Sequence, residues 1–339
     1  MKWKTGTTHL TDTVFQRLYL LIGKMIFHRF KNKSAALLLL LISACGMTAR
    51  CGTPDPISQA DFDALYAEPL SPPQQALSVY HLGHSLVAKD MPAMLAQMAG
   101  AGHSYGSQLG WGSHLRQHWD PEIPIKGFAE SNQHPQYREA HEAMASGDYD
   151  AVVLTEAVEI RQTIKYHDPQ RYLGDWAKSA WSGNPDTRVY FYETWHRHDD
   201  PEGWIERIDL DLERYWEGEI LRRALARDDV TQPIYVIPGG QVMAAFARRV
   251  EAAGGIGPIK NRRDLFKDDI HFNDYGAYLI ALTHYAVLYG RSPVGLPHQL
   301  TLARGGTAAD PGAEAALAMQ ETVWEVVTSY PPTGVSADN

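Results

Sequence analysis

The candidate nucleophile of this chain is Ser85, in the tetrapeptide Gly83-His84-Ser85-Leu86. A glycine there allows a tight turn, and backbone N–H groups at the start of a following helix are free to polarise an approaching carbonyl. Taken alone the tetrapeptide is a weak signal, because a serine after a strand more often caps a helix. Val87 also stands where the nucleophile elbow of α/β-hydrolases has its second glycine.

The candidate base and its partner lie far downstream, in Asp268-Asp269-Ile270-His271. A serine hydroxyl needs a base, and the imidazole needs a carboxylate that fixes its tautomer and stabilises its charged form. The spacing places Asp268 and His271 on one tight turn, so a single loop can deliver both groups. The alternative is that the two aspartates are ordinary loop carboxylates and that His271 caps the next helix.

Secondary-structure elements must bring these distant residues together. The sequence provides them as an alternation of predicted strands and helices. Short apolar segments, nearly continuous as in strands buried on both faces, occupy residues 77–82, 150–155, 188–194 and 233–238, with a weaker one near 103–109. Helical patterns lie between them, notably at 204–227 and 274–290. The alternation predicts one doubly wound α/β domain with a parallel sheet, whose chemistry sits at the carboxyl ends of the strands.

The order of these motifs resembles the SGNH (GDSL-type) hydrolase superfamily over residues 76–290, with the serine block first and the Asp-x-x-His block last. The resemblance implies a flavodoxin-like three-layer α/β/α sandwich with a mainly parallel five-stranded sheet. It also implies hydrolysis of esters, often acyl groups on sugars or lipids, without a cofactor. In that scheme Ser85 is the nucleophile, His271 the general base and then acid, and Asp268 its orienting carboxylate.

The oxyanion hole that the resemblance implies is incomplete. Ser85 and a glycine of the second family block supply backbone N–H groups, and within residues 109–114 we favour Gly112 over Gly110. The family's asparagine donor is absent after the third strand, so the Thr155 hydroxyl is the remaining candidate. Its neighbour Glu156 is not a candidate donor, because an ionised carboxylate would repel an oxyanion. His84, where the family has aspartate, removes no catalytic group.

Two tryptophans that follow predicted strands, Trp111 and Trp195, could stack on a sugar ring in the cleft or merely shield its rim. His114 and His118 lie four residues apart, as a zinc pair on a helix would. No third ligand has a natural spacing, so we expect no metal site.

The N-terminus predicts export. Residues 29–33 are basic, residues 35–44 form an apolar run too short for a permanent membrane span, and the run ends at Cys45 as in a bacterial lipobox. We expect a signal peptide over residues 1–44, with Met25 a possible true start. A lipidated Cys45 would begin a tether over 45–75, followed by the hydrolase domain (76–290) and a C-terminal extension with one flanking helix (291–339). Alternatives are an ordinary cleaved signal, an uncleaved anchor or a Cys45–Cys51 pair.

The net charge and the number of cysteines exclude several classes of protein. The net charge of −9 argues against a nucleic-acid partner, and two cysteines cannot form a disulfide framework or a four-thiolate zinc site. Cleavage after residue 44 would leave 24 basic and 39 acidic residues, a net charge of −15. Anionic headgroups repel such a surface, so acyl chains would hold it at the membrane. Gly46, rather than aspartate, follows the cysteine. By resemblance to lipoproteins of diderm bacteria, this favours the outer membrane, with the domain facing the periplasm.

The sequence therefore predicts a lipid-anchored serine esterase that acts on carboxylic esters, with O-acylated carbohydrate as a plausible substrate class. Two alternatives stay open at this point. One is a catalytically weak or inactive polysaccharide-binding lipoprotein of the same fold, and the other is a metal-dependent phosphoesterase that uses the many histidines.

Overall fold

A five-stranded sheet forms the centre of the molecule in the computed structural model, which describes residues 53–338. All neighbouring strands are parallel, and their order across the sheet is β2-β1-β3-β4-β5. This is the flavodoxin-like order, and it confirms the predicted α/β class. The strands are β1 (Ser78–His84), β2 (Ser104–Gly110), β3 (Ala151–Leu154), β4 (Arg188–Glu193) and β5 (Ile234–Pro238).

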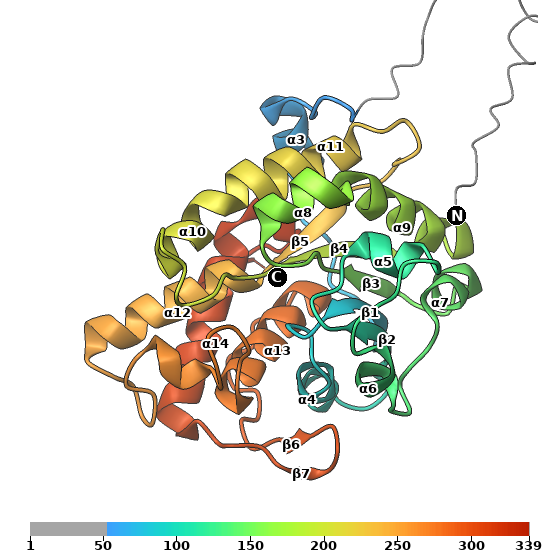
Figure 1. Ribbon diagram of the computed structural model, residues 1–339. Helices are drawn as coiled ribbons and strands as arrows, with labels where there is room; N and C mark the ends of the chain where they lie inside the picture. The colour runs from blue at the N-terminus through green and yellow to red at the C-terminus, as the bar shows by residue number, and fades with distance from the viewer. Residues whose placement is uncertain (1–52, 339) are drawn as a thin grey trace, which may run out of the picture. The chain divides into compact units, whose positions relative to one another are not determined.

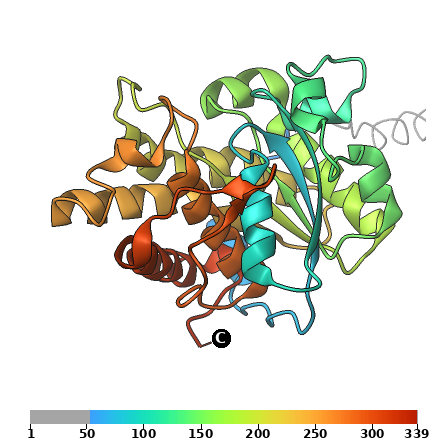
Figure 2. The same cartoon turned by 90° about the horizontal axis from the view of Figure 1, so that it is seen from below.

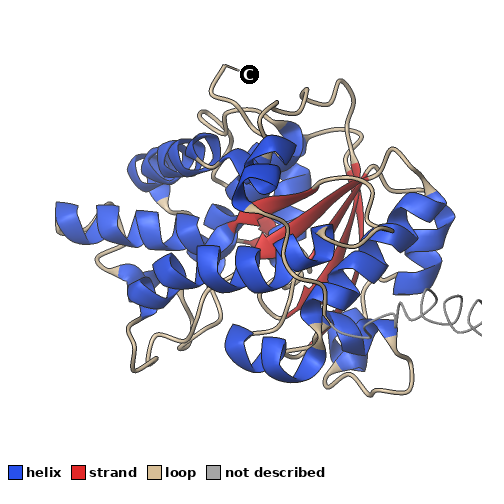
Figure 3. Cartoon of the chain, turned by 90° about the horizontal axis from the view of Figure 1, so that it is seen from above, coloured by secondary structure: helices blue, strands red, loops and turns tan. Residues whose placement is uncertain are grey.

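Alternating side chains of these strands enter two separate hydrophobic cores. On β3, Val153 packs into one core, whereas Val152 and Leu154 pack into the other. Because both faces are covered, the strands read as nearly continuous apolar runs rather than as alternating ones. Figure 3 shows the sheet enclosed between helices, which confirms the three-layer arrangement.

The helices form one layer on each face of the sheet (Figure 1). One layer contains α4 (Asp90–Ala99), α12 (Gly239–Ala253), α13 (Asp274–Tyr289) and α14 (Gly312–Ser329). The other contains α5 (Leu115–Trp119), α7 (Ala140–Ser146), α9 (Pro169–Gly183) and the π-helix η1 (Leu212–Leu221). The remaining helices are α3 (Gln59–Leu65), α6 (Phe128–Asn132), α8 (Ile160–His167), α10 (Trp204–Asp211), α11 (Arg222–Leu225), η2 (Arg262–Leu265) and η3 (Pro331–Thr333).

Two predicted segments differ from the structure. The helix expected over residues 204–227 is present as a continuous helical run, but its middle part, η1, is a π-helix between α10 and α11. Residues 53–75, expected in a tether, instead contain α3 and pack on the domain. Phe62 and Tyr66 are buried there, and the Tyr66 hydroxyl donates to the Ile234 carbonyl at 2.7 Å. A short amphipathic helix with only two large apolar residues gave too weak a pattern to be distinguished from a linker.

The C-terminal extension does more than flank the domain. Helix α14 packs on α12 and α13 as expected. Before it, a small hairpin of β6 (Thr301–Leu302) and β7 (Gly306–Thr307) lies beside α4 (Figure 2). Gln97 of α4 ties the hairpin down, since its side-chain oxygen accepts from the Thr301 amide at 2.9 Å and its amide group donates to the Thr301 carbonyl at 2.8 Å.

The predictions for the N-terminal segment lie outside the described residues. This holds for the signal peptide (1–44), for the start at Met25, for lipidation of Cys45 and for its pairing with Cys51. In the part of the chain from residue 53 to residue 338, no helix is both long enough and apolar enough to cross a membrane.

Candidate active site

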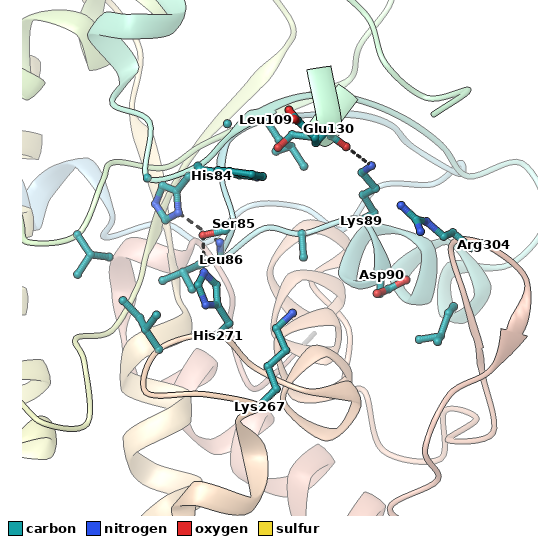
Figure 4. Close-up of a pocket in the computed structure, with 18 residues that line it drawn as sticks. His84, Ser85, Leu86, Lys89, Asp90, Leu109, Glu130, Lys267, His271 and Arg304 are labelled. Atoms are coloured by element: carbon teal, nitrogen blue, oxygen red, sulfur yellow. Dashed lines mark hydrogen bonds between the residues drawn. The ribbon is translucent and has the colours of Figure 1, made fainter. Parts of the chain in front are cut away.

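The structure brings Ser85, His271 and Asp268 into one hydrogen-bonded chain. Figure 4 shows the Ser85 and His271 side chains of this chain. Ser85 directly follows β1, and its Oγ lies 2.9 Å from Nε2 of His271. Nδ1 of His271 lies 2.8 Å from Oδ2 of Asp268 in the loop between η2 and α13. The imidazole can therefore accept the serine proton while the carboxylate holds its other nitrogen protonated, which is the arrangement that activates a serine nucleophile.

Backbone N–H groups fix the Asp268 carboxylate. Its Oδ1 accepts from the amides of Ile270 at 2.9 Å and His271 at 2.7 Å. Burial alone would raise the pKa of Asp268, but these two N–H groups and the imidazole outweigh it and lower the pKa to about 2. The group therefore stays ionised at every pH at which the imidazole could act as a base.

His84 braces the turn that presents Ser85. Its Nδ1 accepts from the Leu86 amide at 3.3 Å, so its Nε2 carries the proton and donates to the Glu156 carbonyl at 2.8 Å. Burial lowers the pKa of His84 to about 4, against the opposing effect of the Glu156 carbonyl, so the ring is neutral near pH 7. His84 thus ties the end of β1 to the end of β3.

Gly83 is required by the close approach of the chain after β3. A Cβ at this position would lie 2.3 Å from Cγ2 of Thr155 and 3.2 Å from Cγ2 of Val87. We expect Gly83→Ala to lower the free energy of unfolding by about 1–3 kcal/mol through overpacking. Thr155→Ser removes the clashing methyl group and keeps the hydroxyl, so the double variant should regain part of the loss. Urea unfolding of the wild type, Gly83→Ala, Thr155→Ser and the double variant measures the loss of stability and its partial recovery. Equal stability of the wild type and Gly83→Ala would contradict this expectation.

Two backbone N–H groups are available beside the serine. Within residues 53–338, the amides of Ser85 and Gly112 donate to no backbone acceptor, and both residues line the cleft. Gly112 adopts φ of 58°, and nothing would touch a Cβ built on it. Gly110, in contrast, is needed for packing, because its Cβ would lie 2.2 Å from Ile125. The geometry is therefore compatible with the choice of Gly112 as a donor.

Thr155 does not face the cleft, so its assignment as the third oxyanion donor is wrong. The side chain is fully buried, and its hydroxyl donates to the Tyr192 carbonyl at 2.7 Å. Its neighbour Glu156 is also buried, and Oε1 of Glu156 accepts from its neighbour Ala157 at 2.8 Å. Both carboxylate oxygens lie 3.3 Å from the Leu115 amide, at the start of α5. Glu156 therefore organises a loop and, as expected, offers no donor.

The two tryptophans that the sequence assigned to the cleft, Trp111 and Trp195, occupy different positions. Trp111 lines the cleft with half of its surface exposed. Trp195 is fully buried, so its assignment to the cleft is wrong. Its indole N–H donates to the Ile270 carbonyl at 2.8 Å, and its ring packs on Phe272 with centroids 6.0 Å apart. Trp195 thus supports the loop of Asp268 and His271 from behind.

His114 and His118 do not form a metal pair. The His118 ring is buried, with Nε2 close to Ser113 Oγ (2.8 Å) and the Gly83 carbonyl (3.0 Å), and burial lowers the pKa of His118 to about 3. His114 instead stacks on His167, with ring centroids 3.7 Å apart. Both histidines are engaged in packing around the end of β1.

One other cluster has ligand-like side chains, namely Glu159, His196 and Asp211. The Arg207 guanidinium already neutralises it, because Nη2 lies 2.6 Å from Glu159 and 2.7 Å from Asp211. Its Nη1 also pairs with Asp200 at 2.8 Å. The chain therefore supplies its own cation among these carboxylates, and the donor set does not fit a metal ion.

The cleft around Ser85 has a volume of about 780 Å³. It lies at the carboxyl ends of β1 and β2 and beside the loop after β3, where the strand order reverses and ligands usually bind in such sheets. Sequence reasoning missed its three cationic residues, Lys89, Lys267 and Arg304. No motif marks them, and Arg304 comes from the C-terminal extension.

Comparisons with known proteins add a distant structural likeness. No known protein family and no curated protein matches the chain. Among solved structures, a candidate GDSL-like lipase from Parabacteroides merdae is similar at 12% sequence identity and a TM-score of 0.40. The likeness covers 64% of this chain and 96% of that one. A likeness at this TM-score carries no information about the reaction.

Proposed function

We propose that the chain is a serine hydrolase of the SGNH (GDSL) type that cleaves carboxylic esters through an acyl-enzyme. The observation that carries this proposal is the continuous hydrogen-bonded chain from Asp268 through His271 to Ser85, at the edge of a cleft with two unpaired backbone N–H groups. The order of the serine and Asp-x-x-His blocks along the chain supports the assignment to this superfamily.

In the proposed reaction, Oγ of Ser85 attacks the carbonyl carbon while Nε2 of His271 takes the hydroxyl proton. The amides of Ser85 and Gly112 stabilise the oxyanion that forms. The carbon–oxygen bond to the alcohol then breaks, and His271 returns its proton to the departing oxygen. A water molecule, deprotonated by His271, then attacks the acyl carbon. The bond between this carbon and Oγ of Ser85 breaks, the acid leaves, and His271 returns the proton to Oγ. Asp268 remains ionised throughout and stabilises the imidazolium.

The cellular setting is also a proposal. We infer a lipid anchor on Cys45 and a periplasm-facing domain at the outer membrane, from the apolar run, the cysteine that ends it and the glycine that follows. Trp111 at the cleft is compatible with an O-acylated carbohydrate, because an exposed indole can stack on a sugar ring.

A series of 4-nitrophenyl esters with increasing acyl length, incubated with the full-length protein, tests the reaction. The proposal expects turnover that depends on Ser85 and is unchanged by a metal chelator, because no step needs a metal ion. Turnover that a chelator abolishes would favour the metal-dependent phosphoesterase instead.

A second candidate is a polysaccharide-binding protein of the same fold without turnover. One observation favours it, since Thr155 and Glu156 leave the place of the family's asparagine without a side-chain donor. Losing one oxyanion donor typically costs about 3 kcal/mol of transition-state stabilisation, which slows a hydrolase but does not abolish its activity. Saccharide binding without any Ser85-dependent turnover would support this candidate.

A further inference from the structure

Three cationic side chains line the Ser85 cleft, although the chain carries a net charge of −9. Lys89 comes from the turn before α4, Lys267 directly precedes Asp268, and Arg304 lies in the hairpin of β6 and β7. In the described part of the chain, no ion pair joins any of the three to a carboxylate. Two acidic residues, Asp90 and Glu130, also line the cleft.

Lys89 and Arg304 lie at the same end of the cleft. Figure 4 shows the Arg304 guanidinium reaching toward the Lys89 side chain, while the Lys89 ammonium group is directed at Glu130. Burial and then the charge of Arg304 lower the pKa of Lys89, and Asp90 offsets this only in part. The Lys89 ammonium group donates to the Glu130 carbonyl at 2.7 Å, a neutral acceptor that leaves its charge uncompensated. Two like charges held together cost free energy that a bound anion would recover.

The fold holds Arg304 at this place. Oδ1 of Asp90 accepts from the Ala303 amide at 2.9 Å, so the residue next to Arg304 is fixed to the start of α4. The Asp90 carboxylate is therefore used to position the hairpin.

A second hollow of about 270 Å³ adjoins the cleft at this pair. Lys89 and Arg304 line both hollows, and the second one adds polar side chains from Tyr105, His134 and Gln136. A substrate bound at Ser85 can thus extend past the two cations into a polar space.

We propose that Lys89 and Arg304 form a subsite for an anionic group, a carboxylate or a phosphate, on the ester that Ser85 attacks. This inference rests on the proposed function and specifies its substrate class as an acidic ester. An arginine beside a lysine suits such a group, because the guanidinium can bind two oxygens at once while the ammonium adds a point charge. The positive wall would also attract an acidic substrate to a protein whose net charge repels it.

Matched ester pairs test the subsite with the full-length protein. In the first pair the anionic group is on the acyl part: 4-nitrophenyl hemiglutarate is compared with the neutral 4-nitrophenyl pentanoate. In the second pair it is on the alcohol part: 4-acetoxybenzoate is compared with its neutral methyl ester. A phosphonate analogue of the hemiglutarate distinguishes phosphate from carboxylate recognition. We expect the wild type to favour the anionic member of at least one pair by about tenfold in kcat/KM.

The preference is the ratio of kcat/KM for the anionic ester to kcat/KM for its neutral partner, measured with one protein. This ratio should fall to the level set by the esters themselves in Lys89→Met/Arg304→Gln. The matched control Lys178→Met/Arg248→Gln removes the same two charges from α9 and α12 and should keep it. In the wild type the preference should also fall as salt is raised to about 0.5 M, because screening weakens exposed charge pairs.

The outcomes separate the two proposals. If Ser85-dependent turnover occurs but neither pair shows a preference, or the preference survives in Lys89→Met/Arg304→Gln, the subsite is wrong and the esterase stands. If no ester is cleaved and a fluorophosphonate does not label Ser85, both are wrong.

Discussion

Ser85→Ala should lower the turnover of any ester that the protein cleaves by roughly 10⁴- to 10⁶-fold. The alanine removes Oγ, the atom that lies 2.9 Å from Nε2 of His271 and that the Asp268–His271 pair can activate. The oxyanion donors are backbone groups and remain, so a small residual rate over water is expected. Initial rates with 4-nitrophenyl acetate, at matched protein concentration, measure the effect.

A control serine makes this result specific. Ser182 lies on α9, where its hydroxyl donates to the Lys178 carbonyl at 2.8 Å. Ser182→Ala should retain the wild-type rate. Equal rates in Ser85→Ala and Ser182→Ala would mean that the hydrolysis does not pass through the proposed nucleophile.

Asp268→Asn should lower kcat by about 10⁴-fold, nearly as much as loss of the serine. The amides of Ile270 and His271 both donate to Oδ1, so the asparagine oxygen is expected to remain there. Its NH₂ group then faces Nδ1 of His271 and donates to it. This moves the imidazole proton to Nε2, which can no longer accept the proton of Ser85.

The neighbouring aspartate provides the matched control. Asp269 is paired with Arg197 and Arg263 on the surface, away from the imidazole. Asp269→Asn should change kcat by no more than a few-fold, because exposed ion pairs contribute little. The double variant Ser85→Ala/Asp268→Asn should be no slower than Ser85→Ala, since the residues act as one unit. A strictly multiplicative loss in the double variant would contradict that coupling.

The fold and the three central residues could be predicted because they depend on periodicity and spacing. Buried parallel strands leave continuous apolar runs, and the carboxyl ends of such strands share one edge of the sheet. Ser85 after β1 and the turn of Asp268 and His271 before α13 therefore had to come close if the chain folded in this way.

The direction of single side chains could not be predicted. Thr155 and Trp195 both stand near strand ends, yet each points into the protein and bonds a carbonyl there. The sequence does not state to which side of a strand end a residue turns, because that depends on which neighbour offers an acceptor. Lys89 and Arg304 were missed for a related reason. They are 215 residues apart in the sequence, and the hydrogen bonds of Asp90 and Gln97 to the hairpin bring them together.

The most direct test of the central claim is the mass of the protein after reaction with a fluorophosphonate. Such a reagent forms a covalent bond with a serine only when a nearby base has made it nucleophilic. We predict a single adduct on the wild type, mapped by peptide sequencing to Ser85 and missing from Ser85→Ala. A wild type that gains no mass, or an adduct on another residue, would contradict the account.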